Sequence, residues 1–314
     1  LGVGIGGIQS LEKEIMDYAK GDGTPRFSPF LITKMITNMA SGHIAMEYGF
    51  HGPNSICSSA CASSNTAIAS AIDQIRLGRA NVMITGGAEA PICQAGIGGF
   101  NSMHALSTRN DDPQSASRPF CKSRDGFVMG EGAGCLVLEE LEHALARGAK
   151  IYAEVAGTGA SADAHHITAS HPEGLGAILA MQHALEDAGM QIEDIDYINV
   201  HGTSTPVGDV SEAKAIVKLF GDHAYKLNIS STKSMIGHLM GAAGAIEGIA
   251  TILAVCNDIV PPTINFTGEE DEAIDYRLNF TFNKPQQRTI RAAISNTFGF
   301  GGQNASIIVK KFVR

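Results

Sequence analysis

A cysteine at position 61 stands between a run of small residues and an alanine-rich segment with helical spacing. The apolar positions between Ala67 and Ile75 recur at helical intervals, and Gly78 follows where a helix normally ends. Cys61 is therefore predicted at a helix start, where free N–H groups and the helix dipole favour a thiolate. Position alone fits a buried, inert cysteine equally well, so the case for a nucleophile depends on other residues.

Two histidines follow the ends of predicted strands. His201 ends the strand Tyr197–Val200 and opens the turn HGTSTPVGD, and strand ends in α/β folds face the crevice where ligands bind. His238 is predicted to begin a helix, where the dipole disfavours the imidazolium and leaves a neutral N–H donor. The other nine histidines are interpreted as structural or surface residues. The adjacent His165 and His166 have no carboxylate or thiol at ligand spacing, so no metal site is predicted.

A charged pair and a glycine-rich stretch accompany these histidines. Lys233 lies in the loop before His238, and Glu247 stands alone in the apolar helix that follows. A lone acid in such a helix is costly, so Lys233 is predicted to pair with it and to orient the histidine. The stretch Asn296–Asn304, NTFGFGGQN, has too many glycines for a plain hairpin. It can turn the backbone N–H of Phe300 toward a ligand, with the ring as a mobile cover.

The elements that would position these residues alternate between strands and helices, which indicates a layered α/β core. A short link near Gly148–Ile151 would divide an N-terminal half, residues 1–149, from a C-terminal half, residues 150–314. Residues 88–130 are interpreted as a long excursion that carries functional loops. The predicted strands are Val82–Thr85, Gly134–Glu139, Ile151–Gly157, Tyr197–Val200, Leu227–Ser231, Ile290–Ser295 and Ser306–Lys310. The predicted helices include Phe30–Tyr48, Glu140–Arg147, Leu175–Ala188, Val210–Phe220 and His238–Val255, with Asp209 and Glu212 as a capping box.

Composition limits the classes of partner. A net charge of −9 argues against nucleic acid, and a chain that is 44% hydrophobic and 18% charged is typical of a soluble globular protein. Six scattered cysteines fit reduced thiols in the cytoplasm better than a disulfide framework. The apolar run Leu239–Val255 is interrupted by Glu247, so no membrane span is predicted. Gly2, Gly4 and Gly7 match a dinucleotide fingerprint weakly, without the strand that should precede it.

Seven long motifs, in order along the whole chain, resemble the β-ketoacyl-acyl-carrier-protein synthases. They are SACASS around Cys61, GGAEA, ALSTRND, RDGFVMGEGAG, HGTSTPVGD at His201, STKSMIGHLMGAAGAIE at Lys233 and His238, and SNTFGFGGQN. The resemblance is strongest to the elongating type II enzymes of bacterial fatty acid synthesis. It implies the thiolase fold, with two similar βαβ-rich halves in α-β-α-β-α layers, working as a cytoplasmic homodimer. It also implies a segment ahead of Gly4, with the first strand and helices of the N-terminal half; a chain without that segment would expose part of its core.

The activity that the resemblance implies is a decarboxylative Claisen condensation. An acyl group would pass from the phosphopantetheine arm of an acyl carrier protein to Cys61, and malonyl-carrier would lose CO₂ and extend it by two carbons. His201 and His238 would hold the malonyl thioester carbonyl, and the backbone N–H groups of Cys61 and Phe300 would hold the oxyanion. Lys233 and Glu247 would complete the catalytic set. No cofactor is implied beyond the carrier-bound substrates.

The remaining expectations concern binding and alternatives. Thr203 and Thr205 match positions that line the carrier-arm tunnel, and Phe298 is a further candidate for substrate binding. Ile5 and Leu31 match the acyl pocket where dimer partners meet, and Arg26 is the candidate for carrier docking. Gln303 stands where the family usually has threonine. Two other interpretations stay open: a ketosynthase of a polyketide or specialised lipid pathway, and a non-catalytic scaffold that pairs with an active subunit.

Overall fold

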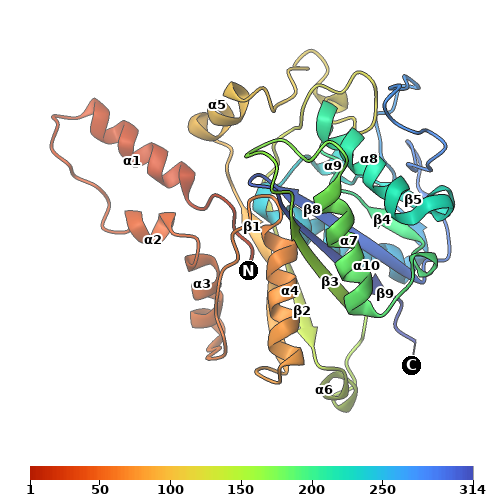
Figure 1. Cartoon of the computed structure of the whole chain (residues 1–314). Helices are drawn as coiled ribbons and strands as arrows, with labels where there is room; N and C mark the ends of the chain where they lie inside the picture. The colour runs from red at the N-terminus through yellow and green to blue at the C-terminus, as the bar shows by residue number, and fades with distance from the viewer. Residues whose placement is uncertain (314) are drawn as a thin grey trace.

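The computed structural model describes residues 1–313, and its centre is a five-stranded sheet (Figure 1). The strand order is β3 (Glu154–Ala162), β9 (Gln303–Lys310), β8 (Ala292–Gly299), β4 (Tyr197–Asn199) and β5 (Asn228–Ser230). Strand β4 pairs in parallel with β5 and β8, whereas β9 runs antiparallel to β3 and β8. The carboxyl ends of β4 and β5 therefore meet at one edge, which is the part of an α/β sheet where ligands bind.

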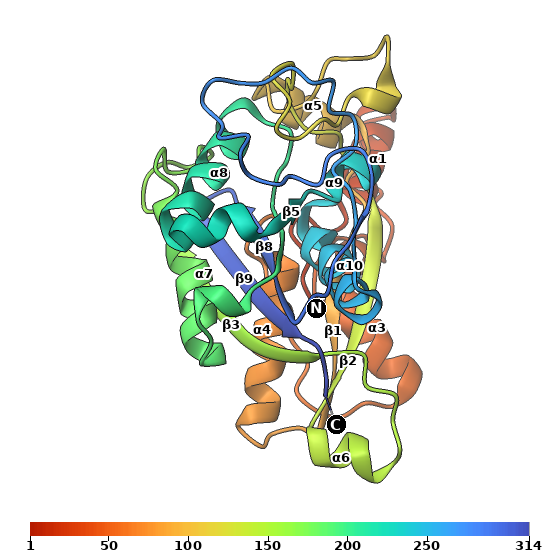
Figure 2. The same ribbon diagram turned by 90° about the vertical axis from the view of Figure 1, so that its right-hand side faces the viewer.

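Helices cover both faces of this sheet (Figure 2). One face packs against α7 (Leu175–Ala188) and α8 (Pro206–Phe220), and the other against α4 (Ser63–Arg76) and α10 (Ala243–Asn257). Beyond α4 and α10 lies an antiparallel pair of strands, β1 (Val82–Glu89) and β2 (Gly132–Glu139). The layers thus follow the predicted order of helix, sheet, helix and sheet from α7 through to β2.

Alternation along the strands explains how the sheet has two apolar faces. Ile198, Ile294 and Ile308 lie in register and pack into the cluster under α7 and α8. Their neighbours Tyr197, Ala293 and Val309 also lie in register, and they pack into the cluster that includes Val255 of α10. Because side chains alternate across a strand, successive residues face opposite layers, so the runs at 292–294 and 307–309 are apolar on both faces.

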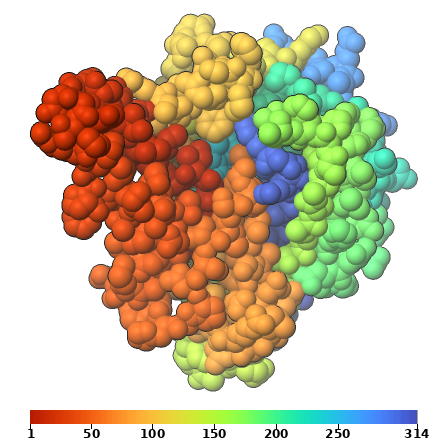
Figure 3. All heavy atoms as spheres, turned by 60° about the vertical axis from the view of Figure 1, so that its left-hand side comes forward, coloured from red at the N-terminus to blue at the C-terminus, as the bar shows by residue number. Residues whose placement is uncertain are grey.

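The first three helices form an arm at the edge of the molecule (Figures 1 and 3). They are α1 (Ile8–Lys20), α2 (Leu31–Met35) and α3 (Met39–Tyr48), and none contains a buried residue. Large apolar side chains on and beside α2 and α3 are exposed; examples are Phe30, Ile32, Met46 and Tyr48. The arm is anchored where Glu12 accepts backbone hydrogen bonds from Gln94 and Ala95 at the start of α5 (Gln94–Ser102).

Short elements complete the chain. They are α6 (Leu141–Ala146), α9 (Lys233–Ile236), the strands β6 (Ile259–Val260) and β7 (Gln286–Gln287), and the 3₁₀ turns Pro113–Ser115, Ile192–Asp194, Gly221–Lys226 and Met240–Ala242. The excursion at 88–130 contains the end of β1, α5 and the 3₁₀ turn Pro113–Ser115, and is otherwise irregular. Within residues 1–313, the segment Met240–Asn257 is the one helical stretch long and apolar enough to cross a membrane, and 61% of it is buried inside the molecule. That burial is typical of a core helix.

Two predicted helices differ from those observed. The predicted helix Phe30–Tyr48 is broken, because Ile36 is extended with ψ 137° and separates α2 from α3. β-Branched residues cluster before this break, and they lose rotamer freedom in a helix. The helix predicted to begin at His238 begins instead at Ala243, after a 3₁₀ turn.

The predicted capping box at Asp209 and Glu212 is wrong. Helix α8 begins four residues earlier, at Pro206, a residue well suited to a first helical position because its missing N–H would be unpaired there anyway. Both carboxylates are buried inside the helix and accept hydrogen bonds from neighbouring loops. The expectation that Asn296–Asn304 has too many glycines for a plain hairpin is also wrong, because β8 and β9 pair as far as Gly299 and Gln303 and leave a tight turn.

Candidate active site

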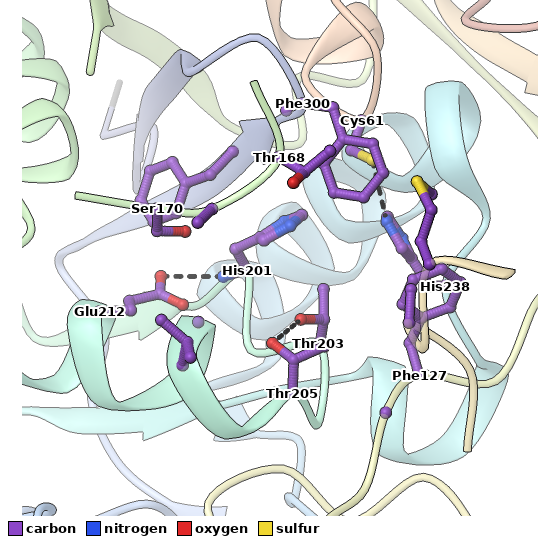
Figure 4. Close-up of a pocket in the computed structure, with 18 of the residues that line it drawn as sticks. Cys61, Phe127, Thr168, Ser170, His201, Thr203, Thr205, Glu212, His238 and Phe300 are labelled. Atoms are coloured by element: carbon purple, nitrogen blue, oxygen red, sulfur yellow. Dashed lines mark hydrogen bonds between the residues drawn. The ribbon is translucent and has the colours of Figure 1, made fainter. Parts of the chain in front are cut away.

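Cys61 lies on a strained turn directly before α4. Ala60 has φ 49°, a left-handed conformation that costs energy for any residue other than glycine. Two bonds close the turn: the amide of Ala62 donates to the carbonyl of Ser59, and the amide of Ser63 donates to that of Ala60. The turn places the sulfur at a cavity of about 310 Å³ (Figure 4).

The hairpin of β8 and β9 packs directly on this turn. A Cβ added to Gly299 would lie 2.5 Å from the carbonyl oxygen of Ser59 and 3.2 Å from the backbone nitrogen of Cys61. Only glycine permits so close an approach. Burial raises the pKa of the Cys61 thiol, and the backbone N–H of Phe300, which this approach brings near, acts in the opposite direction. The ring of Phe300 lies over the cavity, 6.4 Å from the ring of Phe100 on α5.

His238 is held by its backbone against the segment 128–130. Its amide donates to the carbonyl of Val128 at 2.7 Å, and the amide of Gly130 donates to the carbonyl of His238 at 2.9 Å. The buried ring then places Nε2 3.1 Å from Sγ of Cys61. Phe127 meets the imidazole edge-on, with 5.2 Å between ring centroids. The histidine is thus fixed in contact with the thiol.

His201 reaches the same cavity from the end of β4. The amides of His201 and Gly202 donate to the two carboxylate oxygens of Glu212 on α8, at 2.9 and 2.8 Å. Its ring lies 5.3 Å from that of His238 and nearly perpendicular to it, and 5.6 Å from the ring of Phe298. A thiol from the layer of α4 and two imidazoles from the sheet edge therefore converge in one cavity (Figure 4).

Burial controls the charge state of these groups. It raises the pKa of the Cys61 thiol to about 11, although Lys233 and the N–H of Phe300 act in the opposite direction. The predicted preference of the helix start for a thiolate is therefore outweighed by desolvation. Burial, reinforced by the charge of Lys233, holds the pKa of both His201 and His238 well below the usual range. The unliganded site thus contains a protonated thiol and two neutral imidazoles.

The predicted pairing of Lys233 with Glu247 is present. The two side chains form a salt bridge between α9 and α10, and both are about 1% exposed. Burial raises the pKa of Glu247 to about 7, and the charge of Lys233 opposes that rise. Lys233 also accepts, at its carbonyl, the hydroxyl of Ser117 and the amide of Gly237, which precedes His238. The pair therefore fixes the loop that carries this histidine.

Most of the predicted binding residues lie at the cavity, and two do not. Thr203 and Thr205 line it with hydroxyls 3.0 Å apart, and Phe298 lines it as well. Ile5 packs against the apolar cluster that contains Cys61. Leu31 lies on α2 and is neither a lining residue nor a member of that cluster. Arg26 is exposed on the arm and forms a salt bridge with Asp22.

Several residues of the site were not predicted from the sequence to belong to it. Glu212 positions His201. Its burial could have been predicted as for Glu247, because apolar residues surround Glu212 in its helix and an acid there is costly without a partner. Phe127 and Met240 pack against Cys61. Neither lies in an α-helix or a strand, so no periodic pattern of apolar residues marks them in the sequence. Within residues 1–313 no group of three ligating side chains can hold a metal ion.

The chain matches two family descriptions that together cover most of its length. Residues 1–144 match "Beta-ketoacyl synthase, N-terminal domain", and residues 152–267 match "Beta-ketoacyl synthase, C-terminal domain". The chain therefore belongs to the β-ketoacyl synthase family, as the sequence motifs predicted.

Individual relatives narrow this class. The protein named 3-oxoacyl-[acyl-carrier-protein] synthase 2 of Synechocystis sp. is 49% identical over 312 residues, which are 99% of this chain and 74% of that protein. Its namesake in Coxiella burnetii is also 49% identical, with the same coverage of both chains. Among solved structures, a β-ketoacyl synthase from Burkholderia phymatum has a TM-score of 0.92 and 36% identity, over 99% of this chain and 74% of that one.

A second solved structure shows a ketosynthase with a carrier. It is a type II PKS acyl-carrier protein in complex with its ketosynthase bound to the hexaketide, with a TM-score of 0.92 and 35% identity over 98% of this chain and 76% of that one. These neighbours are thiolase-fold ketosynthases, and the predicted fold class is confirmed.

Proposed function

We propose that this chain is an elongating 3-oxoacyl-acyl-carrier-protein synthase, an acyltransferase that extends fatty acyl chains by two carbons. The observation that carries the proposal is the contact of 3.1 Å between Sγ of Cys61 and Nε2 of His238, with His201 beside them in the same cavity. The relatives at 49% identity carry this name, whereas the polyketide ketosynthase is 35% identical, so fatty acid synthesis is favoured.

The first step transfers the acyl group to Cys61. Sγ attacks the carbonyl carbon of the carrier thioester to form a tetrahedral intermediate, which collapses as the bond to the carrier sulfur breaks. Because the thiol is protonated in the free enzyme, its proton must leave during attack, and it ends on the departing carrier thiol. His238 is the group placed to hold that proton in passage. The N–H groups of Cys61 and Phe300 stabilise the oxyanion of the tetrahedral intermediate.

The second step forms the carbon–carbon bond. The malonyl thioester carbonyl accepts N–H bonds from the neutral rings of His201 and His238, and loss of CO₂ leaves an enolate there. The enolate carbon attacks the acyl carbonyl on Cys61, the sulfur leaves as a thiolate that then takes a proton from water, and a β-ketoacyl group remains on the carrier. Neutral donors suit this step because the site is buried, and the charge of Lys233 nearby favours the transient anion.

The partner that supplies both substrates is an acyl carrier protein. Its phosphopantetheine arm would pass Thr203 and Thr205 to reach Cys61, and Arg26 would contribute to docking the acidic carrier surface. The solved ketosynthase in complex with its acyl-carrier protein supports this partner. No further cofactor takes part, because the arm arrives with the substrate. The reduced thiol that the reaction needs fits the cytoplasm.

A second copy of the chain would complete the acyl pocket. The exposed apolar side chains of the arm support a homodimer, since patches of this kind mark interfaces. Leu31 would then serve the pocket through the dimer contact, next to Ile5. Within each copy, residues 1–149 and 150–314 act as two thiolase-like halves that each contribute reacting groups.

Intact mass spectrometry after mixing with acyl-carrier protein tests the proposal. The wild-type chain should gain one acyl mass, and Cys61→Ala should gain none. His201→Ala should still form the acyl-enzyme but release CO₂ from malonyl-carrier at least about a hundredfold more slowly. Full condensation by Cys61→Ala would disprove the assignment. A wild-type chain that is acylated on Cys61 but accepts only polyketide intermediates would instead be assigned to a polyketide pathway.

A further inference from the structure

Glu89, the last residue of β1, is a buried carboxylate that the reaction described above does not use. It accepts hydrogen bonds from the backbone amides of Gly4 at 2.7 Å, Ile5 at 3.1 Å, Gly6 at 3.0 Å and Gly241 at 3.1 Å. Its side chain is almost fully enclosed, and no lysine or arginine among residues 1–313 forms a salt bridge with it. The charge is therefore stabilised chiefly by four peptide N–H groups, which bind an anion more strongly than a neutral acceptor.

The fit around this carboxylate requires glycine. A Cβ added to Gly241 would lie 2.5 Å from a carboxylate oxygen of Glu89 and 2.4 Å from the nitrogen of Gly4. A Cβ added to Gly4 would lie 2.9 Å from the same oxygen. The carboxylate thus joins two loops that are more than 230 residues apart in the chain. The glycine spacing that weakly resembles a phosphate-binding loop offers its N–H groups to this side chain instead.

Each loop places an apolar side chain against the cluster that contains Cys61, and Met240 also lines the cavity. Ile5, between the donors Gly4 and Gly6, packs against the cluster that contains Cys61. Met240, directly before Gly241, belongs to the same cluster and has φ 49°, a strained conformation that must be held in place. The hydroxyl of Ser64, near the start of α4, donates to the carbonyl of Gly241 and ties this wall to the helix that follows Cys61.

We infer that Glu89 is a positioning residue that sets the acyl side of the Cys61 cavity by holding Ile5 and Met240 through their neighbouring backbone amides. This inference rests on the proposed function, because it assigns the two side chains to the pocket that receives the acyl chain. Glu89 touches neither substrate nor sulfur in this arrangement, so it acts through the loops. A long acyl chain, which extends further past these walls, depends on them more than a short one.

The charge of Glu89 gives a second, independent readout. It raises the pKa of Cys61, as Glu247 does, while Lys233 lowers it. The other titratable groups that face the sulfur are His238 and His201, both kept neutral by burial. Removal of the Glu89 charge should therefore move the midpoint of Cys61 alkylation to lower pH.

The experiment compares Glu89→Gln and Glu89→Asp with the wild-type chain. Glu89→Gln replaces one carboxylate oxygen, which accepts hydrogen bonds, with an NH₂ group that faces backbone N–H donors. Glu89→Asp keeps the negative charge, but its side chain is one methylene shorter and reaches these amides less well. In both variants kcat/KM for tetradecanoyl-carrier should fall at least about tenfold relative to hexanoyl-carrier. The alkylation midpoint should fall in Glu89→Gln and stay unchanged in Glu89→Asp. Glu140→Gln is the matched control, since Glu140 also accepts two backbone amides, at the far end of β2.

A double-mutant cycle with Ile5→Ala tests whether Glu89 acts through that loop. In the Ile5→Ala background the change in chain-length preference caused by Glu89→Gln should be smaller than in the wild type. A change of equal size in both backgrounds, or no change in either, would overturn the inference. Should Glu89→Gln not fold, Glu89→Asp is taken through the same cycle and decides in the same way.

The two readouts separate this inference from the proposed function. A wild-type chain that forms no acyl-enzyme defeats the proposed function whatever Glu89 does. Glu89 is then judged on iodoacetamide alkylation of Cys61 alone, which needs no substrate. A lower midpoint of Cys61 alkylation in Glu89→Gln supports the position of the Glu89 charge beside the cavity. An unshifted midpoint overturns the inference.

Discussion

The thiol of Cys61 is kept protonated by the same burial that shelters its reaction from water. A peptide thiol has a pKa of about 8.5, whereas burial raises the pKa of Cys61 to about 11. Lys233 and one backbone N–H only partly offset the loss of hydration. The sulfur is therefore reactive only when proton transfer accompanies attack, which protects it from adventitious electrophiles.

Alkylation of Cys61 should show this directly. Because only the thiolate reacts, the rate with iodoacetamide should keep rising with pH through pH 10, and at pH 8 about one part in a thousand of the thiol is ionised. The measurement is intact mass against time at each pH. Cys61→Ala gives the background from the other five cysteines. A plateau reached below pH 9 would contradict the raised pKa.

The pair of Lys233 and Glu247 should be worth more for stability than any exposed pair. Lys233→Ala leaves Glu247 buried without a counter-charge, and such a loss typically costs about 3–5 kcal/mol. Urea denaturation measures the free energy of unfolding, and the double variant Lys233→Met, Glu247→Leu should recover much of the loss. Lys13→Ala, which removes the exposed pair with Asp17, is the control and should have no measurable effect. Equal destabilisation by both single changes would contradict the argument.

Residue-level prediction from the sequence worked where a residue type is costly without a partner. Glu247 in an apolar helix indicated Lys233, and the structure has that pair. The same reasoning was not applied to Glu212, which was assigned to a helix end although α8 begins at Pro206. Glu89 gave no such signal, because its partners are backbone amides and these have no identity in a sequence. The protonation of Cys61 was missed because burial depends on tertiary packing.

At the level of elements, the hairpin of β8 and β9 sets the distance between Phe300 and the nucleophile. Gly299→Ala should push the hairpin away, since its Cβ would lie 2.5 Å from the carbonyl oxygen of Ser59. We expect condensation to fall at least about a hundredfold, because one oxyanion donor moves, and stability to fall by about 1–3 kcal/mol. Turnover and urea denaturation check these values.

The control for this change is Gly42→Ala in α3. Nothing lies within 4 Å of a Cβ added there, and its backbone is helical, so activity should be retained. Full activity in Gly299→Ala would mean that the N–H of Phe300 is not a donor in the reaction.

Elements with uninterrupted periodicity were predictable, and those shaped by their surroundings were not. The helix predicted at Leu175–Ala188 has the bounds of α7. The prediction of one helix at Phe30–Tyr48 is wrong at Ile36. There the extended backbone favoured by β-branched residues interrupts a helical pattern that looked continuous in the sequence. The glycine-rich stretch was expected to have too many glycines for a plain hairpin, yet its glycines allow a neighbouring turn to approach a regular hairpin. Glycine content alone does not distinguish these two uses.

At the scale of the whole molecule, the arm predicts self-association. Its apolar side chains have no contact that buries them in one chain, so sedimentation velocity should show a dimer at micromolar concentration. Phe30→Asp should shift the chain toward the monomer, because a charge in an apolar interface is costly. Val313→Glu, at an exposed site near the other end of the chain, should leave the dimer intact. A wild-type chain that sediments as a monomer would contradict the proposed assembly.

Fold class was the most predictable property at this scale, because alternating strand and helix patterns leave few arrangements of layers. The parallel pairing of β4 with β5 and β8 places His201 and Lys233 near one edge, as the rule for strand ends requires. The order of strands in the sheet could not be read from local pattern, since it is set by contacts between distant segments.

The position of β9 has a consequence for how the protein becomes active during its synthesis. This strand is made after both β3 and β8, yet it lies between them in the sheet. Until it leaves the ribosome the sheet cannot close, and the hairpin that brings Phe300 to Cys61 cannot form. A nascent chain without β9 therefore carries its thiol with no competent site around it, and catalysis starts only after this strand has joined the sheet.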